Sequence, residues 1–173
     1  MNEINTELTE EQKEKIDNEL VYYPRNPSFD EIIDNIYVGN YAFALNKKML
    51  IDNKITHILN CGNGLMNFYE KENIFKYLYR PLYDSPNEKI EKHLEKSNKF
   101  IKEGSENGNK VLVHCGCGVS RSVTVTYMYM IMEKGYTFSK AKEIMSNKRK
   151  CAYPNEGFVK QLMAKSMELH HEI

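Results

Sequence analysis

The sequence has no net charge, no long apolar run and few cysteines. Its 173 residues include 24 basic and 24 acidic side chains, and such a balance provides no strong field to attract a polyanion. No stretch of 18 apolar residues occurs, and the N-terminus MNEINTELTEEQKEKIDNEL lacks the apolar core of a signal peptide. We therefore expect neither nucleic acid nor a membrane among the partners, and we expect a location in the cytoplasm or also in the nucleus.

The four cysteines do not form a metal-binding pattern. Cys61, Cys115, Cys117 and Cys151 include no pair of CxxC units accompanied by histidines, so we expect no metal and no other cofactor. Hydrophobic residues make up 41% of the chain and charged residues 28%. A chain of this length and composition can bury one core without disulfide or metal.

The first 27 residues are polar, and we interpret them as an extension that precedes a single domain at residues 28–173. A capping box at Thr9 and Gln12, or a weaker one at Thr6 and Thr9, predicts a short helix within this extension. Pro24 then interrupts the chain before the domain begins.

Strands and helices alternate through the domain. The β-branched and apolar runs predict a strand and turn in IIDNIYVGN, and further strands in ITHILNC, in YLYRPLYD ending at Asp84, and in KVLVHC. Helical spacing predicts helices at residues 41–53, 88–104, 121–135, 139–150 and 154–171. This alternation favours an α/β fold with layers of helices on a sheet.

The segment VLVHCGCGVSRS places a glycine-rich loop between a strand and a helix. Cys115 follows the strand, and Arg121 stands six positions later at the start of the helix. Such a loop points backbone N–H groups at an anion, and the helix dipole adds positive potential. The planar guanidinium of Arg121 matches two phosphoryl oxygens. The sequence therefore predicts a phosphate site that consists of Gly116, Cys117, Gly118, Val119, Ser120 and Arg121.

A thiol at the base of this loop lies in a positive field that favours the thiolate, so Cys115 is predicted to be a nucleophile that forms a phosphocysteine intermediate. Asp84 lies at the carboxyl end of another strand, where a parallel sheet brings it to the same edge, and we predict that it is the general acid. A solvated aspartate in a turn before Ser85 is the alternative. Ser122 is predicted to donate a hydrogen bond to the sulfur and ease its departure in the second step. His114 is predicted to hold the loop in place through hydrogen bonds.

HCGCGVSRS resembles the HCxxGxxRS signature of the cysteine-dependent phosphatases, in the form seen in dual-specificity protein phosphatases of the small atypical type. The likeness covers residues 28 to 165 through NIYVGNYAFAL, ITHILNC, Asp84 with Ile90, and AYPNEGFVKQL. It implies a central, mostly parallel twisted sheet flanked by helices, a phosphatase-type phosphate loop between strand and helix, and no metal. The implied substrates are phosphotyrosine, phosphoserine and phosphothreonine in proteins, and phosphate or sulfate can occupy the site.

The sequence departs from this family at two positions. Cys117 stands where the family often has alanine, and Lys89 replaces an acidic residue that follows the general acid. Neither change removes a catalytic group. The loop contains no lysine, whereas relatives that act on phosphoinositides usually have basic residues there, so lipid substrates are disfavoured.

Three further residues are predicted to have supporting roles. Asn60 and Asn155 are predicted to brace the site through hydrogen bonds, with direct contact to the substrate as the alternative. Cys61 ends a strand that lies beside the strand of Cys115 in the family fold, so we predict that peroxide joins the two cysteines in a disulfide. Simple packing of Cys61 in the core is the alternative. A bridge from Cys115 to Cys117 is disfavoured because it would strain the loop.

Three other functions use similar loops. A phosphate-reading module without turnover has no support, because the nucleophile, the arginine and the acid are all present. An arsenate-reductase-like or sulfur-transfer enzyme is disfavoured by Asp84 and by PNEGF. An RNA 5′-triphosphatase is disfavoured by the neutral charge.

Overall fold

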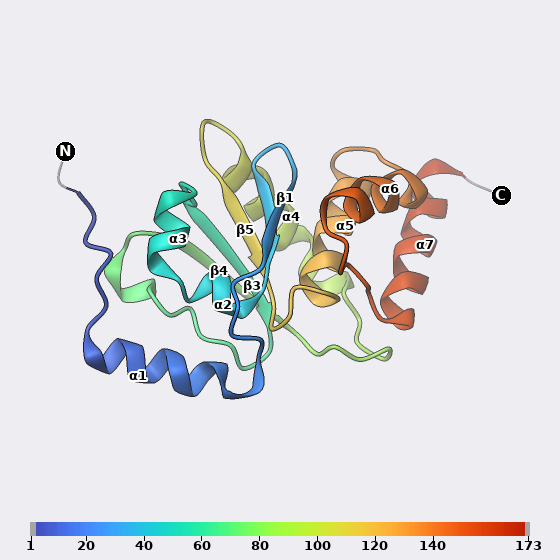
Figure 1. The fold of residues 1–173 in the computed structure, drawn as a ribbon. Coiled ribbons are helices and arrows are strands. Elements are labelled where there is room, and N and C mark those ends of the chain that lie inside the picture. The colour runs from blue at the N-terminus through green and yellow to red at the C-terminus, as the bar shows by residue number, and fades with distance from the viewer. Residues whose placement is uncertain (1–2, 172–173) are drawn as a thin grey trace.

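Five strands form one sheet in the order β1-β2-β5-β3-β4 in the computed structural model, which describes residues 3–171 (Figure 1). The only antiparallel pair in this sheet is β1 with β2; β2 with β5, β5 with β3, and β3 with β4 are parallel. The predicted mostly parallel α/β fold is thus confirmed. The strands are β1 (Phe29–Ile33), β2 (Ile36–Gly39), β3 (His57–Gly62), β4 (Lys76–Leu82) and β5 (Val111–His114).

Helices cover both faces of the sheet (Figure 1). One hydrophobic cluster packs α4, α5, α6 and α7 on one face, and a second packs α1, α2 and α3 on the other. The helices are α1 (Glu10–Glu19), α2 (Tyr41–Ala44), α3 (Lys47–Asp52), α4 (Glu91–Ser105), α5 (Arg121–Met132), α6 (Phe138–Lys148) and α7 (Glu156–His170), with short 3₁₀ turns at Leu20–Tyr22 and Glu70–Glu72.

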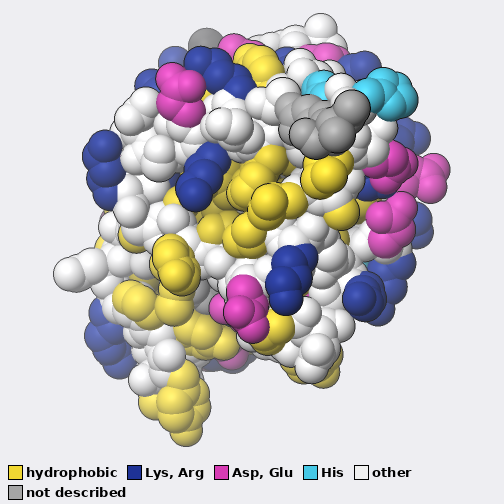
Figure 2. Space-filling model, turned by 90° about the vertical axis from the view of Figure 1, so that its right-hand side faces the viewer, with side chains coloured by type: hydrophobic (Ala, Val, Ile, Leu, Met, Phe, Trp, Pro, Cys, Tyr) yellow, Lys and Arg dark blue, Asp and Glu magenta, His cyan; other side chains and the backbone are white. Residues whose placement is uncertain are grey.

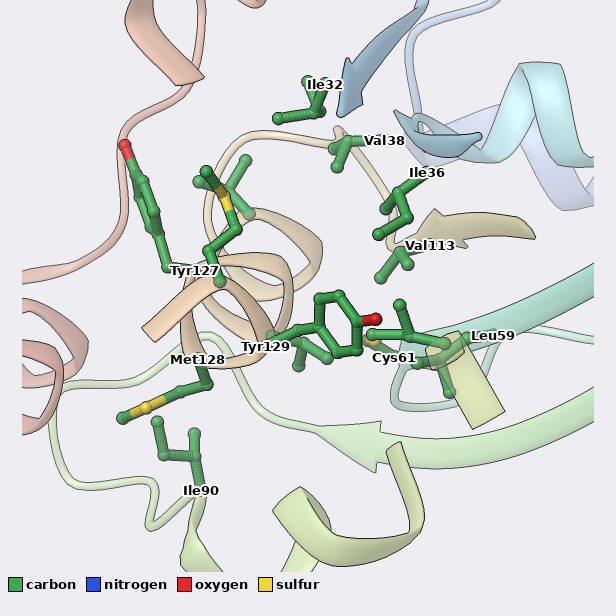
Figure 3. Close-up of a cluster of buried hydrophobic side chains, with 14 of the residues drawn as sticks. Ile32, Ile36, Val38, Leu59, Cys61, Ile90, Val113, Tyr127, Met128 and Tyr129 are labelled. Carbon is green, nitrogen blue, oxygen red and sulfur yellow. The ribbon is translucent and has the colours of Figure 1, made fainter. Parts of the chain in front are cut away.

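The alternation of side chains along the strands decides which face receives the cysteines. Val113 and Cys115 belong to the cluster under α5, whereas Leu112 belongs to the opposite cluster, as a period of two requires. Leu59 and Cys61 of β3 follow the same pattern, and Figure 3 shows both beside Tyr129 of α5. The two cysteines therefore share the α5 face of the sheet.

Three local predictions were wrong. IIDNIYVGN was expected to be one strand with a turn, but Asp34 and Asn35, both at positive φ, divide it into a hairpin between β1 and β2; these residue types tolerate that conformation. Residues 41–53 form two helices instead of one, because Asn46 caps a new start by accepting from Met49 N. The strand predicted to end at Asp84 ends at Leu82.

The polar N-terminal extension packs against the sheet-covering helices. α1 begins with the capping box of Thr9 and Gln12, and Leu20 is buried in the cluster of α2 and α3. On the far side of the molecule, hydrophobic side chains gather in a groove between α6 and α7, where Phe138, Val159 and Met163 lie beside Lys142 (Figure 2). The extension therefore lies on the opposite face of the sheet from this groove.

Candidate active site

The glycine-rich loop connects the end of β5 to the first residue of α5. Cys115 follows β5 directly and is only 2% exposed. Its sulfur lies 3.2 Å from the hydroxyl oxygen of Ser122, in the first turn of α5. The loop thus brings together the predicted nucleophile and its predicted hydrogen-bond donor.

Several carbonyls of the loop accept hydrogen bonds from neighbouring elements. Tyr41 N donates to Gly116 O at 3.0 Å, and Tyr153 N donates to Val119 O at 2.8 Å. The backbone N–H and the hydroxyl of Thr124 both donate to Ser120 O. By contrast, no amide N–H between residues 116 and 121 donates to another group within residues 3–171. A curved run of such unengaged N–H groups at a helix N-terminus is suited to bind an anion.

Arg121 adds a charged donor to the same site. Its Nη1 donates to Leu82 O at 3.3 Å, while its Nε is buried and has no hydrogen-bond partner among the described protein groups. Buried donors of this kind are rare in proteins and cost free energy unless a ligand or water pairs with them. The guanidinium therefore has a donor available for an oxyanion, and its role in phosphate binding stays a prediction.

Asp84 is held at the rim of the loop by two hydrogen bonds to a single carboxylate oxygen. Ser120 Oγ donates to Asp84 Oδ1 at 2.8 Å, and Asn155 Nδ2 donates to the same atom at 2.9 Å. The Asn155 backbone N–H also donates to Ser120 Oγ, so the three residues form one network. The structure therefore brings Asp84 to the loop. Ser120, predicted to bind phosphate, uses its hydroxyl for this aspartate.

His114 is a buried neutral residue at the base of the loop. Its ring is 1% exposed, lies 3.4 Å from Cys115 O through Nδ1, and is parallel to the ring of Tyr41. Burial lowers the pKa of His114 to about 4, and the nearby Arg121 charge acts in the same direction. A neutral imidazole is compatible with the predicted structural role.

Asn60 and Cys61 lie at the end of β3, next to the loop. Asn60 Nδ2 donates to Leu65 O and to Asn67 Oδ1, while its Oδ1 accepts from Gly62 N. Asn60 therefore braces the segment after β3, and within residues 3–171 it makes no hydrogen bond to the phosphate loop. Cys61 and Cys115 are both buried free thiols in the same cluster, and burial raises the pKa of Cys61 well above its ordinary value. Their redox partnership stays a prediction.

The sequence analysis missed two residues that contact the loop. A Cβ at Gly116 would lie 2.5 Å from Cε1 of Tyr23 and 3.3 Å from Nη2 of Arg121, so the N-terminal extension supplies an aromatic ring beside the loop. Arg149, at the end of α6, donates through Nε to Gly118 O at 2.8 Å. Neither contact has a local signal, since Tyr23 follows another tyrosine and Arg149 lies between two lysines.

Comparison with known proteins agrees with this geometry. Residues 36–168 match the family model of the dual specificity phosphatase catalytic domain. A probable rhodanese domain-containing dual specificity protein phosphatase from Dictyostelium discoideum is 41% identical over 133 residues, which cover 76% of this chain and 28% of that protein. Human dual specificity protein phosphatase 22 is 37% identical over 133 residues, covering 77% of this chain and 71% of that protein. The chain belongs to the dual specificity phosphatase family.

Solved structures show the same fold. A crystal structure of a mouse putative dual specificity phosphatase complexed with zinc tungstate has a TM-score of 0.76 and 26% sequence identity, covering 84% of this chain and 91% of that one. The chain spans only 20%, 28% and 16% of the length of three Dictyostelium discoideum relatives. Tyr23 and the whole N-terminal extension lie outside the segment that the family model matches. Among residues 3–171, no helix has the length and apolar character needed to cross a bilayer.

Proposed function

We propose that this domain hydrolyses phosphate esters of tyrosine, serine and threonine in proteins through a phosphocysteine intermediate. The observation that carries the proposal is the loop itself. The Cys115 thiol lies at its base, the N–H groups of residues 116–121 have no partner within the described chain, and the guanidinium of Arg121 has an unengaged donor. Family membership supports the same activity.

In the first step, the thiolate of Cys115 attacks phosphorus and the bond to the leaving oxygen breaks. Asp84 transfers its proton to that oxygen. The free Oδ2 suits this task, since Oδ1 already accepts from Ser120 and Asn155. Arg121 and the loop N–H groups stabilise the charge that spreads over the three other phosphoryl oxygens.

In the second step, water attacks the phosphocysteine and the phosphorus–sulfur bond breaks. Asp84, now ionised, takes a proton from the water. The departing sulfur carries the electron pair, and the Ser122 hydroxyl at 3.2 Å donates to it. Inorganic phosphate and the thiolate of Cys115 are restored at the end of the cycle.

Four features support the narrower assignments. The loop residues Gly116, Cys117, Gly118, Val119 and Ser120 carry no basic side chain, which favours phosphoproteins over phosphoinositides. The equal numbers of acidic and basic residues disfavour nucleic acid. The mouse relative is described in complex with tungstate, an oxyanion of phosphate-like shape. The four free cysteines suit a reducing compartment, and we propose the cytoplasm or also the nucleus.

The test compares purified protein on matched substrates. Release of phosphate is measured from phosphotyrosine, phosphothreonine and phosphoserine peptides, from an RNA 5′-triphosphate and from a phosphoinositide in detergent. We expect turnover of the peptides and none of the other two substrates. Hydrolysis of RNA or lipid at rates above those of the peptides would overturn the substrate class. Binding of phosphopeptides without release of phosphate would identify a binding module instead.

A further inference from the structure

Arg149 is a fully buried cation that reaches the phosphate loop from α6. The residue is 1% exposed. Its Nε donates to Gly118 O at 2.8 Å, and its Nη1 forms an ion pair with Asp30 Oδ2 of β1 at 2.7 Å. Nη2 is buried without a hydrogen-bond partner in the described chain. One side chain therefore joins the loop, the edge hairpin and the end of α6.

Burial of this guanidinium is not explained by stability alone. Removing an arginine from water costs several kcal/mol, and an ion pair compensates for that cost only with good geometry and further hydrogen bonds. The pairing with Asp30 is incomplete in this respect, because the Asp30 side chain is 39% exposed and Nη2 is left unpaired. A purely structural contact at this place would be met more simply by an apolar residue.

The partner of Arg149 in the loop is a backbone carbonyl at a special position. Gly118 has φ +67, and a Cβ there would lie 2.7 Å from both Arg149 Nη2 and the carbonyl oxygen of Gly39. The loop is thus packed against the guanidinium with no room for a side chain. Because a peptide unit is planar and trans, its C=O and N–H point in opposite directions. The bond to Gly118 O therefore fixes the N–H of Val119 on the opposite side.

We propose that Arg149 is a positioning residue of the phosphate site. It holds the Gly118 carbonyl outward, so that the Val119 N–H faces the bound phosphoryl group. The inference rests on the proposed phosphatase function. Two other loop carbonyls receive only neutral backbone donors, from Tyr41 and Tyr153. Arg149 supplies the charge-assisted one, which is the stronger kind, and it adds positive charge behind the loop.

The test measures oxyanion affinity independently of turnover. Tungstate binding to the full chain is titrated by calorimetry, and the competitive inhibition constant of inorganic phosphate is measured with p-nitrophenyl phosphate. Arg149→Met removes the donor and the charge. We expect the dissociation constant of tungstate and the inhibition constant of phosphate each to rise about tenfold, the effect typical of one lost hydrogen bond to a charged group. Arg149→Lys keeps the charge but cannot reach Gly118 O and Asp30 at once, so we expect a smaller loss of about threefold.

Met145→Ala is the matched control, because Met145 is fully buried on the same helix and is not part of the loop. It should lower the melting temperature and leave both constants unchanged. Unaltered affinity in folded Arg149→Met, or an equal loss in Met145→Ala, would overturn the proposal. If Arg149→Met does not fold, unaltered affinity in Arg149→Lys overturns it. If the wild-type protein showed no turnover while Arg149→Met still weakened tungstate binding, only the proposed phosphatase function would be overturned.

Discussion

The hydroxyl oxygen of Ser122 lies 3.2 Å from the sulfur of Cys115, and both side chains are buried. The serine belongs to α5 and the cysteine follows β5, so the contact spans the whole phosphate loop. A donor at this position stabilises developing negative charge on sulfur. Ser122 should therefore matter most when the phosphorus–sulfur bond breaks, and less when it forms.

Asp84→Asn should lower turnover of alkyl phosphates by roughly 10²- to 10⁴-fold, the contribution typical of general acid catalysis. The side chain of asparagine keeps the hydrogen-bonding shape but has no proton to transfer. The loss should shrink for p-nitrophenyl phosphate, whose leaving group needs little protonation. Steady-state rates across a series of leaving groups measure this dependence.

Glu88→Gln is the control for that experiment. Glu88 accepts from Tyr83 N, next to Asp84, and is the nearest alternative acid in sequence. It should retain activity. If Glu88→Gln lost activity and Asp84→Asn kept it, the acid would be misassigned.

Tyr23→Ala should raise the KM for phosphotyrosine peptides by about 3- to 10-fold, the effect typical of one lost aromatic contact. The ring of Tyr23 lies against Gly116 and is held edge to face on Tyr41, with centroids 5.6 Å apart. The Tyr23 ring offers an apolar surface to the phenyl ring of phosphotyrosine. Phosphothreonine has no such ring, so its KM should change less. Peptides that differ only in the phosphorylated residue measure the preference.

Tyr22→Ala is the matched control, since the Tyr22 side chain is 90% exposed. Tyr22→Ala should leave the KM unchanged for both the phosphotyrosine and the phosphothreonine peptides. A Tyr23→Ala variant that loses activity equally on phosphotyrosine and phosphothreonine peptides would show that the ring only supports the fold.

Peroxide should join Cys61 to Cys115 in a reversible disulfide. β3 and β5 pair Asn60 with His114; Cys61 is the next residue of β3, and Cys115 is the first residue after β5. Both thiols are buried in the same hydrophobic cluster, and neighbouring strands lie about 4.8 Å apart, close to the Cα separation of a disulfide. Oxidation of Cys115 to a sulfenic acid precedes attack by Cys61, which releases water. Since burial raises the pKa of Cys61, the bridge should form faster as the pH rises. Mass mapping of unreduced peptides measures it.

Cys117 and Cys151 compete with this reaction, because both are exposed free thiols. Because the predicted bridge protects Cys115 from further oxidation, Cys61→Ser should abolish the recovery of activity by reductant. Recovery that is unchanged in Cys61→Ser but lost in Cys117→Ser would assign the protection to the loop cysteine instead.

Acid should destabilise the fold through His114. Its pKa is about 4 when folded and 6.5 when exposed, so the unfolded state binds the extra proton between these values. The contribution of neutral His114 to the free energy of unfolding is therefore fully present above pH 6.5. It is lost as the pH falls toward 4, by up to about 3 kcal/mol. His114→Asn should have a lower free energy of unfolding than wild type at pH 7, and the difference between the two free energies should be smaller at pH 5. Denaturant unfolding at the two pH values checks this, and a constant difference would contradict it.

The sequence predicted the parts of the site that depend on local patterns. The apolar run before Cys115, the two loop glycines and the apolar helix after Arg121 were enough to predict strand, loop and helix. The position of Asp84 followed from a parallel sheet, although β4 ends two residues earlier at Leu82. Pro81 inside this strand is tolerated because β4 is at the edge of the sheet.

The contacts made across the fold could not be predicted in this way. The ion pair of Arg149 with Asp30 joins residues 119 positions apart. Its sequence context, KRK, is equally typical of a solvated surface. The docking of Tyr23 depends on how α1 packs on α2 and α3, and the periodicity of these three helices does not specify that packing. Such contacts depend on tertiary packing, which local propensity does not encode.

The most direct measurement is to detect the covalent intermediate by rapid quench and mass spectrometry of the intact protein. Wild type mixed with p-nitrophenyl phosphate should carry a transient phosphoryl group on Cys115. In Ser122→Ala this species should accumulate, because its hydrolysis is slowed. Cys115→Ser should show neither intermediate nor turnover, yet it should still bind tungstate through the loop and Arg121, whereas Arg121→Lys should impair both binding and turnover. A phosphoryl group on another residue, or turnover by Cys115→Ser at a rate near that of wild type, would contradict the account.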